Sequence, residues 1–192
     1  MISVCVLAGG KSSRFGADKL TAPFRGKFLI SNILDELTDF PEVILITKFP
    51  FKFLPLVRTY HNLKVVVESF SEFSPIYGIY TGLRSAKFGK VIFVPGDVPL
   101  LKGELVRKLT LEVPPAVVVK EKRFHSLFTV ISKFSLPKVE EFLRSGRHKL
   151  RELHGELNSR PIPFEKFQHL DFRGDSLKNV NRQEDYIEAV CR

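Results

Sequence analysis

Apolar runs rich in β-branched residues recur along this chain, and stretches with a helical pattern separate them. The runs are mostly continuous rather than alternating, as expected of strands that are buried on both faces of a sheet. Five runs predict strands, over residues 2–7, 43–47, 63–67, 90–94 and 116–119. Helices are predicted between them, over residues 28–37, 50–58, 75–85 and 102–111. This order is typical of βαβ units around a mostly parallel sheet.

The pattern changes after the fifth run. Residues 124–132 predict a further strand, which follows the fifth run after a brief polar turn and is therefore expected to be antiparallel. Residues 136–153 are predicted to be helical with a break at Gly146. Residues 160–164 predict a short last strand, and residues 182–192 predict a terminal amphipathic helix. The fold class is therefore α/β, with an antiparallel strand in the C-terminal half.

The size of the chain suits one hydrophobic core. With 192 residues, 44% of them hydrophobic, a single domain over residues 1–192 is predicted. No apolar run approaches the length of a membrane span and no basic leader precedes the first strand, so we expect a cytoplasmic protein. Cys5 and Cys191 form neither a CxxC pair nor a metal-binding spacing, and both are predicted to be inert thiols.

The charge balance favours an anionic partner without identifying it. Thirty basic residues against 21 acidic ones give a net charge of +9, which suits nucleic acid, an anionic membrane surface or small phosphates. The basic residues are spread along the chain, which is also typical of a solvated basic surface. Because there is no aromatic and basic RNA-binding motif and no helix-turn-helix signal, we predict no nucleic-acid partner. No membrane partner is predicted either, since no apolar run is long enough to span a membrane.

The stretch LAGGKSSRFGADK, residues 7–19, directly follows the first predicted strand. In a parallel sheet the ligand crevice lies beyond the carboxyl ends of the strands, where a glycine-rich loop lets backbone amides approach a phosphate. Arg14 and Lys19 would add charge-assisted contacts to phosphate oxygens. The stretch fits neither the Walker loop nor the dinucleotide fingerprint. The alternative is a surface loop whose glycines merely satisfy a positive φ.

The second informative stretch is VIFVPGDVPLL, residues 91–101. A strand ends there and Asp97 follows, which places one carboxylate at the sheet edge that also carries the glycine-rich loop. Because Mg²⁺ prefers few carboxylates together with waters and substrate phosphates, Asp97 is the predicted magnesium ligand. Alternatively, Asp97 caps the helix that is expected to begin near Leu101.

These stretches resemble a known superfamily. Residues 7–19 are similar to the signature LAGG-x-S-x-R-x-G-x-DK of the Rossmann-like nucleotidyltransferases. Within that superfamily the chain resembles the molybdenum cofactor guanylyltransferases, the MobA family. The similarity continues through Gly26 and Lys27, residues 75–83, the GDVP stretch and residues 179–186. The resemblance implies a single-domain, three-layer α/β/α Rossmann-like fold with a nucleotide-binding half, about residues 1–100, and an acceptor-binding half, about residues 101–192.

The resemblance also implies a reaction: Mg²⁺-dependent transfer of GMP from GTP to the terminal phosphate of molybdopterin, with release of pyrophosphate. It implies that the guanine nucleotide contacts Leu7, Ala8, Gly9 and Gly10. Lys19 and Arg14 would hold the phosphates and act in catalysis with Asp97, the metal ligand. Glu68 stands about where the family has an aspartate that contacts the nucleoside, and its carboxylate could accept hydrogen bonds from guanine N1 and N2 or from ribose.

The predicted acceptor-binding residues are Asn179, Asn181 and His125. The two asparagines match the last motif of the family, although they could instead be turn residues capping the helix from Arg182. His125 begins a His-Ser-Leu sequence where the family has His-Pro-Thr, and it could instead be a partly buried strand residue. A basic cluster could line the acceptor pocket or decorate a helix: Arg144, Arg147, Lys149 and Arg151.

Other functions remain open from the sequence. The chain could be a CTP-dependent molybdopterin cytidylyltransferase, a sugar-phosphate nucleotidyltransferase, or a non-catalytic GTP-binding or nucleic-acid-binding protein. The resemblance favours GTP and molybdopterin as partners, in a monomer that makes transient contacts with other molybdenum cofactor biosynthesis proteins.

Overall fold

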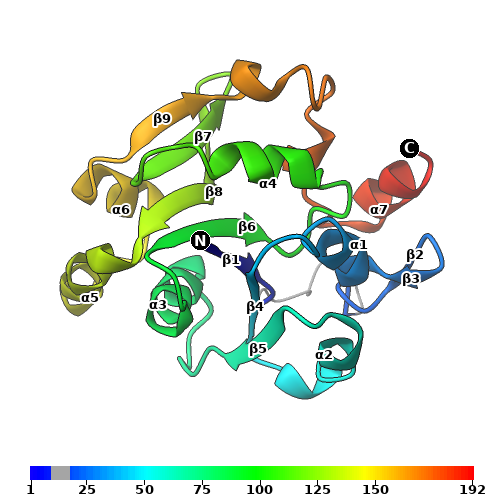
Figure 1. The fold of residues 1–192 in the computed structure, drawn as a ribbon, viewed down its shortest axis with the longest axis horizontal. Coiled ribbons are helices and arrows are strands. Elements are labelled where there is room, and N and C mark those ends of the chain that lie inside the picture. Colours follow the sequence, from blue (N-terminus) through cyan, green and yellow to red (C-terminus); the bar gives the residue numbers. More distant parts are fainter. Residues whose placement is uncertain (10–17) are drawn as a thin grey trace.

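A computed structural model describes residues 1–9 and 18–192 of the chain. One seven-stranded sheet crosses the molecule in the order β5-β4-β1-β6-β8-β7-β9 (Figure 1). Its strands are β1 (Ile2–Leu7), β4 (Glu42–Thr47), β5 (Leu63–Val67), β6 (Lys90–Pro95), β7 (Ala116–Lys120), β8 (Arg123–Ser132) and β9 (Arg160–Pro163). The α/β class predicted from the sequence is therefore confirmed.

The strand directions agree with the predicted mixed sheet. Strand β1 pairs in parallel with β4 and β6, and β4 pairs in parallel with β5. Strand β8 is antiparallel to both β6 and β7, while β9 is parallel to β7. Glu121 and Lys122 form the β7–β8 turn with φ of 50° and 64°, as a two-residue type I′ hairpin requires. Every strand except β8 therefore ends at the same edge of the sheet.

The helices mostly lie where the sequence predicts them. They are α1 (Leu29–Asp35), α3 (Pro75–Ser85), α4 (Gly103–Leu109), α5 (Leu136–Arg144), α6 (Leu150–Glu156) and α7 (Gln183–Val190). The break between α5 and α6 contains Gly146, whose φ is 73°, so the predicted interruption is confirmed. The predicted helix 50–58 is wrong as one element, because it consists of the 3-10 turn η1 (Pro50–Lys52) and the short α2 (Leu56–Thr59).

A small hairpin before α1 was not predicted from the sequence. Strands β2 (Pro23–Phe24) and β3 (Lys27–Phe28) pair antiparallel, and Arg25 and Gly26 form their turn with φ of 51° and 81°. The hairpin leads directly into α1. The predicted helix start at Phe28 is therefore one residue early, because Phe28 ends β3.

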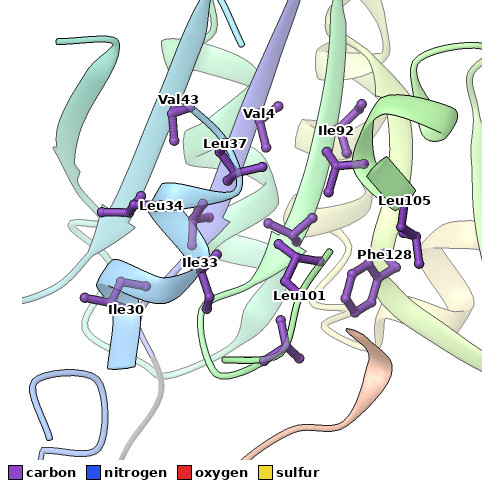
Figure 2. Packing of buried hydrophobic residues seen from close by; sticks show 14 of the residues in the cluster. Val4, Ile30, Ile33, Leu34, Leu37, Val43, Ile92, Leu101, Leu105 and Phe128 are labelled. Carbon is purple, nitrogen blue, oxygen red and sulfur yellow. The ribbon is translucent and has the colours of Figure 1, made fainter. Parts of the chain in front are cut away.

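Helices cover both faces of the sheet, which makes the three layers of the predicted Rossmann-like fold (Figure 1). On one face, Val4, Val43 and Ile92 of the sheet pack against residues of α1 and α4 (Figure 2). On the other face, the intervening strand residues pack against α3, α5 and α6, as Cys5 and Phe93 do. This alternation follows from the period of two along a strand and explains why the runs are apolar throughout.

Helix α3 lies so close to the sheet at Gly82 that no larger residue would fit there. A Cβ on Gly82 would lie 2.5 Å from the ring of Phe93 and 2.9 Å from Sγ of Cys5.

Cys5 is fully buried and burial raises the pKa of its thiol, whereas Cys191 is exposed. Neither described cysteine is in a disulfide. No helix in the described ranges is long and apolar enough to cross a membrane.

Candidate active site

Backbone contacts join the ends of β1 and β6 at the carboxyl edge of the sheet. The amide of Gly96 donates to the carbonyl of Leu7 at 2.9 Å. A Cβ on Gly96 would lie 2.7 Å from that carbonyl oxygen, so only glycine permits the approach. The residue before Asp97 therefore has to be glycine, because its backbone lies against Leu7 and Ala8 at the end of β1.

Asp97 connects three segments that are far apart in the sequence. Its Oδ2 accepts from Nζ of Lys19 at 2.7 Å, and its Oδ1 accepts from Nδ2 of Asn179 at 2.8 Å. Its backbone carbonyl accepts from the amide of Val180 at 2.8 Å. The alternative assignment of Asp97 as a helix cap is wrong, since the N-cap of α4 is Lys102.

The Lys19 ammonium lies at the centre of this cluster. Besides Asp97, it donates to the carbonyl of Val180 at 2.9 Å and to Oδ1 of Asn181 at 3.0 Å. These three acceptors match the three donors of an ammonium group. Lys19 is only 8% exposed, so the charge is largely removed from bulk water.

The Asn181 side chain is turned towards Lys19 rather than towards the end of α7. The N-cap of that helix is Arg182, and Oδ2 of Asp185 accepts from the backbone amides of residues 181 and 182. The alternative assignment of Asn181 as the capping side chain is therefore wrong. Both asparagines of the predicted motif, Asn179 and Asn181, instead contact the Lys19–Asp97 pair.

A cavity of about 290 Å³ opens beside this cluster. It is lined by seven residues that the sequence analysis selected: Leu7, Ala8, Gly9, Lys19, Glu68, Asp97 and Asn179. Its other lining residues were not predicted: Leu20, Ile46, Phe73, Ser74, Pro75, Gly78, Pro95 and Leu127. Apolar walls with a few convergent polar groups are typical of small-molecule sites. Gly10 and Arg14, also predicted for this site, lie outside the described residues.

Glu68 lies in the wall of this cavity and is almost fully buried. Its Oε1 accepts from the amide of Phe70 at 2.8 Å and from Nζ of Lys48 at 3.1 Å. Its Oε2 lies 3.8 Å from the position of a Cβ on Gly9. Lys48 was not predicted from the sequence, although its place directly after β4 puts it at the same edge of the sheet.

A second cavity, of about 680 Å³, is lined by both asparagines. All three predicted acceptor residues line it: Asn179, Asn181 and His125. Its charged lining residues are Lys120, Glu121, Arg123, Lys178, Asp185, Glu188 and Arg192. Lys178 and Arg192 pair with Asp175 and Glu188. Asn179 lines both cavities.

The hairpin of β7 and β8 gives the second cavity a positively charged wall. On the hairpin of β7 and β8, burial lowers the pKa of His125 below its usual 6.5, and the nearby cations Arg123 and Lys120 lower it further. The imidazole is therefore neutral at pH 7 and can both donate and accept a hydrogen bond. Lys120 also packs over the ring of Phe164, 5.2 Å from its centroid.

The basic cluster of the C-terminal half lies elsewhere. None of its four residues, all of them described, lines the larger cavity. Arg147 pairs with Glu156 and Lys149 pairs with Glu152, while Arg151 lies over the ring of Phe124. These contacts support the interpretation of the cluster as surface charge on and around α5 and α6.

The donor set at Asp97 is compatible with a hard divalent cation. In the described ranges, no three His, Cys, Asp or Glu side chains gather closely enough to hold a metal ion on their own. Mg²⁺ does not require such a group, because it is commonly bound by one or two carboxylates together with water and substrate phosphates. Asp97 is partly exposed, with 18% of its side chain accessible, and lines the smaller cavity.

The chain is similar to proteins of one family. The sequence profile described as MobA-like NTP transferase domain matches residues 4–160. A "Probable molybdenum cofactor guanylyltransferase" of Aquifex aeolicus is 35% identical over 189 residues, which cover 96% of this chain and 88% of that protein. A protein of the same name from Carboxydothermus hydrogenoformans is 29% identical, with 98% of this chain and 95% of that protein covered.

A solved structure shares the fold. The molybdopterin-guanine dinucleotide biosynthesis protein A of Archaeoglobus fulgidus superposes with a TM-score of 0.81, covering 97% of this chain and 96% of that one. Its sequence identity is 22%, so this likeness concerns the fold alone.

Proposed function

The chain belongs to the family of MobA-like NTP transferases, and on that premise we propose that it is a molybdenum cofactor guanylyltransferase. It transfers GMP from GTP to the terminal phosphate of molybdopterin, yielding a guanine dinucleotide cofactor and pyrophosphate. The observation that carries this proposal is the cluster of Lys19, Asp97 and Asn179 at the border of two cavities. A transferase that joins two substrates needs two binding sites that meet where the bond is made.

The two cavities support a division of labour between the halves of the domain. Apart from Leu127 and Asn179, the smaller cavity is lined by residues before position 100. Apart from Leu100, the larger cavity is lined by residues after position 100. We therefore assign GTP to the smaller cavity, in the half that spans about residues 1–100, and molybdopterin to the larger one.

The nucleotide side offers a polar edge and apolar walls. We assign the base to the region around Leu7, Ala8 and Gly9, with the Glu68 carboxylate as acceptor for its N–H groups. The triphosphate would extend towards Lys19 and Asp97, and the predicted loop contacts of Gly10 and Arg14 belong to the same assignment. Nucleotidyltransferases of this kind generally use a divalent metal ion. Mg²⁺ held by Asp97 would neutralise charge on the triphosphate and on the incoming phosphate.

The chemistry requires alignment rather than a protein nucleophile. An oxygen of the molybdopterin phosphate attacks the α-phosphorus of GTP, and the bond from that phosphorus to the bridging oxygen of the β-phosphate breaks. A terminal phosphate is already anionic near neutral pH, so no strong general base is needed. The work of the chain is to orient both anions and to offset charge on the leaving pyrophosphate, for which Lys19 is placed.

The acceptor side is suited to an anion that carries a ring system with many hydrogen-bonding groups. Lys120 and Arg123 supply positive charge on the β7–β8 hairpin, and the neutral imidazole of His125 follows two residues after Arg123 on β8. Asn179 and Asn181 close the cavity on the side of Lys19. We assign the acceptor phosphate to this end, next to the α-phosphorus.

The proposed function is tested by supplying one radiolabelled nucleotide at a time. The purified protein with Mg²⁺ and molybdopterin is expected to form a labelled dinucleotide and pyrophosphate from GTP, and not from CTP, ATP or UTP. GTP should also raise the melting temperature, since binding stabilises the native state in proportion to ln(1 + [L]/Kd). Consumption of CTP instead would identify a cytidylyltransferase, and GTP binding without pyrophosphate release would identify a nucleotide sensor.

Replacement of Arg123 by glutamine should weaken the binding of molybdopterin and leave the binding of GTP unchanged. We expect the KM for molybdopterin to rise about 10-fold, the order expected for loss of a charge-assisted hydrogen bond, with the KM for GTP unchanged. Steady-state kinetics with each substrate varied in turn measures both constants. The matched control is Arg144→Gln, in the surface cluster outside the cavity. A rise in the KM for GTP alone would contradict the assignment of the two cavities.

A further inference from the structure

Lys48 is a nearly buried cation that the assignments above leave without a role. It directly follows β4, and 9% of its side chain is exposed. Its Nζ donates to Oε1 of Glu68 at 3.1 Å and to the carbonyl of Phe70, and it lies 4.8 Å from the ring centroid of Phe73. All three partners belong to the segment after β5. Lys48 therefore ties one strand end to the segment that forms a wall of the nucleotide cavity.

We propose that Lys48 is a positioning residue that sets base specificity by fixing the Glu68 carboxylate. The proposal rests on the function proposed above. Lys48 and the amide of Phe70 both donate to Oε1. The other oxygen, Oε2, lies next to Gly9, which lines the cavity. One oxygen is thus used as an anchor and the other is presented to the ligand.

Burial makes this anchoring necessary. Glu68 is 5% exposed, and a carboxylate removed from water is costly unless an opposite charge and hydrogen bonds compensate. Lys48 supplies that charge through its ion pair with Oε1, and the amide of Phe70 supplies a hydrogen bond. An ionised carboxylate only accepts hydrogen bonds, and it therefore requires a ligand edge that donates.

Guanine is the base that meets this requirement best. Its N1–H and its 2-amino group are adjacent donors on one edge, and they match the acceptors of a carboxylate. Cytosine and adenine place their single amino donor beside a ring acceptor, and uracil has one N–H between two carbonyl groups. A Glu68 carboxylate fixed by its ion pair with Lys48 therefore favours guanine over the acceptor edges of the other bases.

The test compares GTP with inosine triphosphate, which keeps N1–H but lacks the 2-amino group. We measure kcat and KM for both nucleotides with the unaltered protein, Lys48→Met and Lys48→Arg. In Lys48→Met the KM for GTP is expected to rise about 10-fold with a smaller change in kcat, and the preference for GTP over inosine triphosphate should largely disappear. Lys48→Arg retains the charge and should restore most of the preference.

Glu68→Gln tests whether Lys48 acts through the Glu68 carboxylate. Because Lys48 acts through Glu68, the variant Lys48→Met/Glu68→Gln should lose no more preference than Glu68→Gln alone. Melting temperatures show whether each variant is folded, and Glu68→Gln and Lys48→Arg keep the test valid if Lys48→Met does not fold. Lys64→Met, at an exposed lysine of β5, is the matched control.

The outcomes separate this inference from the proposed function. If the unaltered protein transfers no GMP from GTP, the proposed function fails and this inference fails with it. If transfer from GTP is normal and folded Lys48→Met keeps the full preference over inosine triphosphate, this inference alone is overturned. Additive losses in the double variant would likewise overturn it.

Discussion

Asp97→Asn is expected to reduce guanylyl transfer by about 10²-fold or more, the order found when one preorganised electrostatic contact is lost. The amide keeps the shape of the side chain but removes its negative charge. That charge compensates the Lys19 ammonium at 2.7 Å and is the predicted anchor of Mg²⁺. The loss should appear mainly in kcat, measured as pyrophosphate released from GTP with saturating Mg²⁺ and molybdopterin.

Two measurements accompany the Asp97 variant. Asp39→Asn is the control, because Asp39 is an exposed aspartate in a surface ion pair with Arg107. If the variant binds the ion more weakly, its rate should reach a maximum only at a higher Mg²⁺ concentration than the unaltered protein requires. Unchanged turnover in folded Asp97→Asn would remove Asp97 from the catalytic group and leave the metal assignment without a residue.

Lys19→Met is expected to lower turnover by a similar factor, about 10²-fold or more. The methionine keeps most of the alkyl stem but removes the ammonium. Its three acceptors, on Asp97, Val180 and Asn181, are then left without this donor. A partly buried acceptor that loses its partner costs about 1–3 kcal/mol, so the melting temperature should fall as well. Kinetics and thermal unfolding of the same preparation separate the two effects.

The Lys19 result has a clear alternative outcome. If this lysine only joins the C-terminal segment to the sheet, Lys19→Met lowers the melting temperature while kcat falls no more than the folded fraction. If it also stabilises the leaving pyrophosphate, kcat falls far beyond that fraction at a temperature where the variant is fully folded. Lys64→Met serves as the control for a lysine removed from an exposed position.

Local patterns carried most of the fold prediction. The continuous apolar runs placed the main strands because burial on both faces leaves a strong signal, and the short polar turn after β7 predicted the antiparallel β8. The β2–β3 hairpin was missed because strands of two residues are too short to form any pattern. The stretch 50–58 was predicted as one helix, but Pro55 lies inside it and α2 begins just after that proline.

The residues of the candidate site could be predicted where a short stretch of sequence is enough to identify them. Gly96 and Asp97 follow a strand, so their place at the carboxyl edge came from topology alone. The partners of Lys19 could not be predicted, because Asp97 and Asn181 are 78 and 162 residues away and meet it only through packing. Lys48 gave no signal, since a single lysine after a strand is ordinary until its carboxylate partner is placed.

One residue, Asn179, lines both cavities of this molecule. Its side chain is fixed to Asp97 between them. If GTP and molybdopterin occupy these cavities as proposed, a substrate that moves the Asn179 side chain changes the binding site of the other. Thermodynamic reciprocity then requires that whatever coupling the first substrate exerts on the second is returned in equal measure. Under the proposed assignment, the affinity for either substrate is therefore meaningful only when the occupancy of the neighbouring cavity is stated with it.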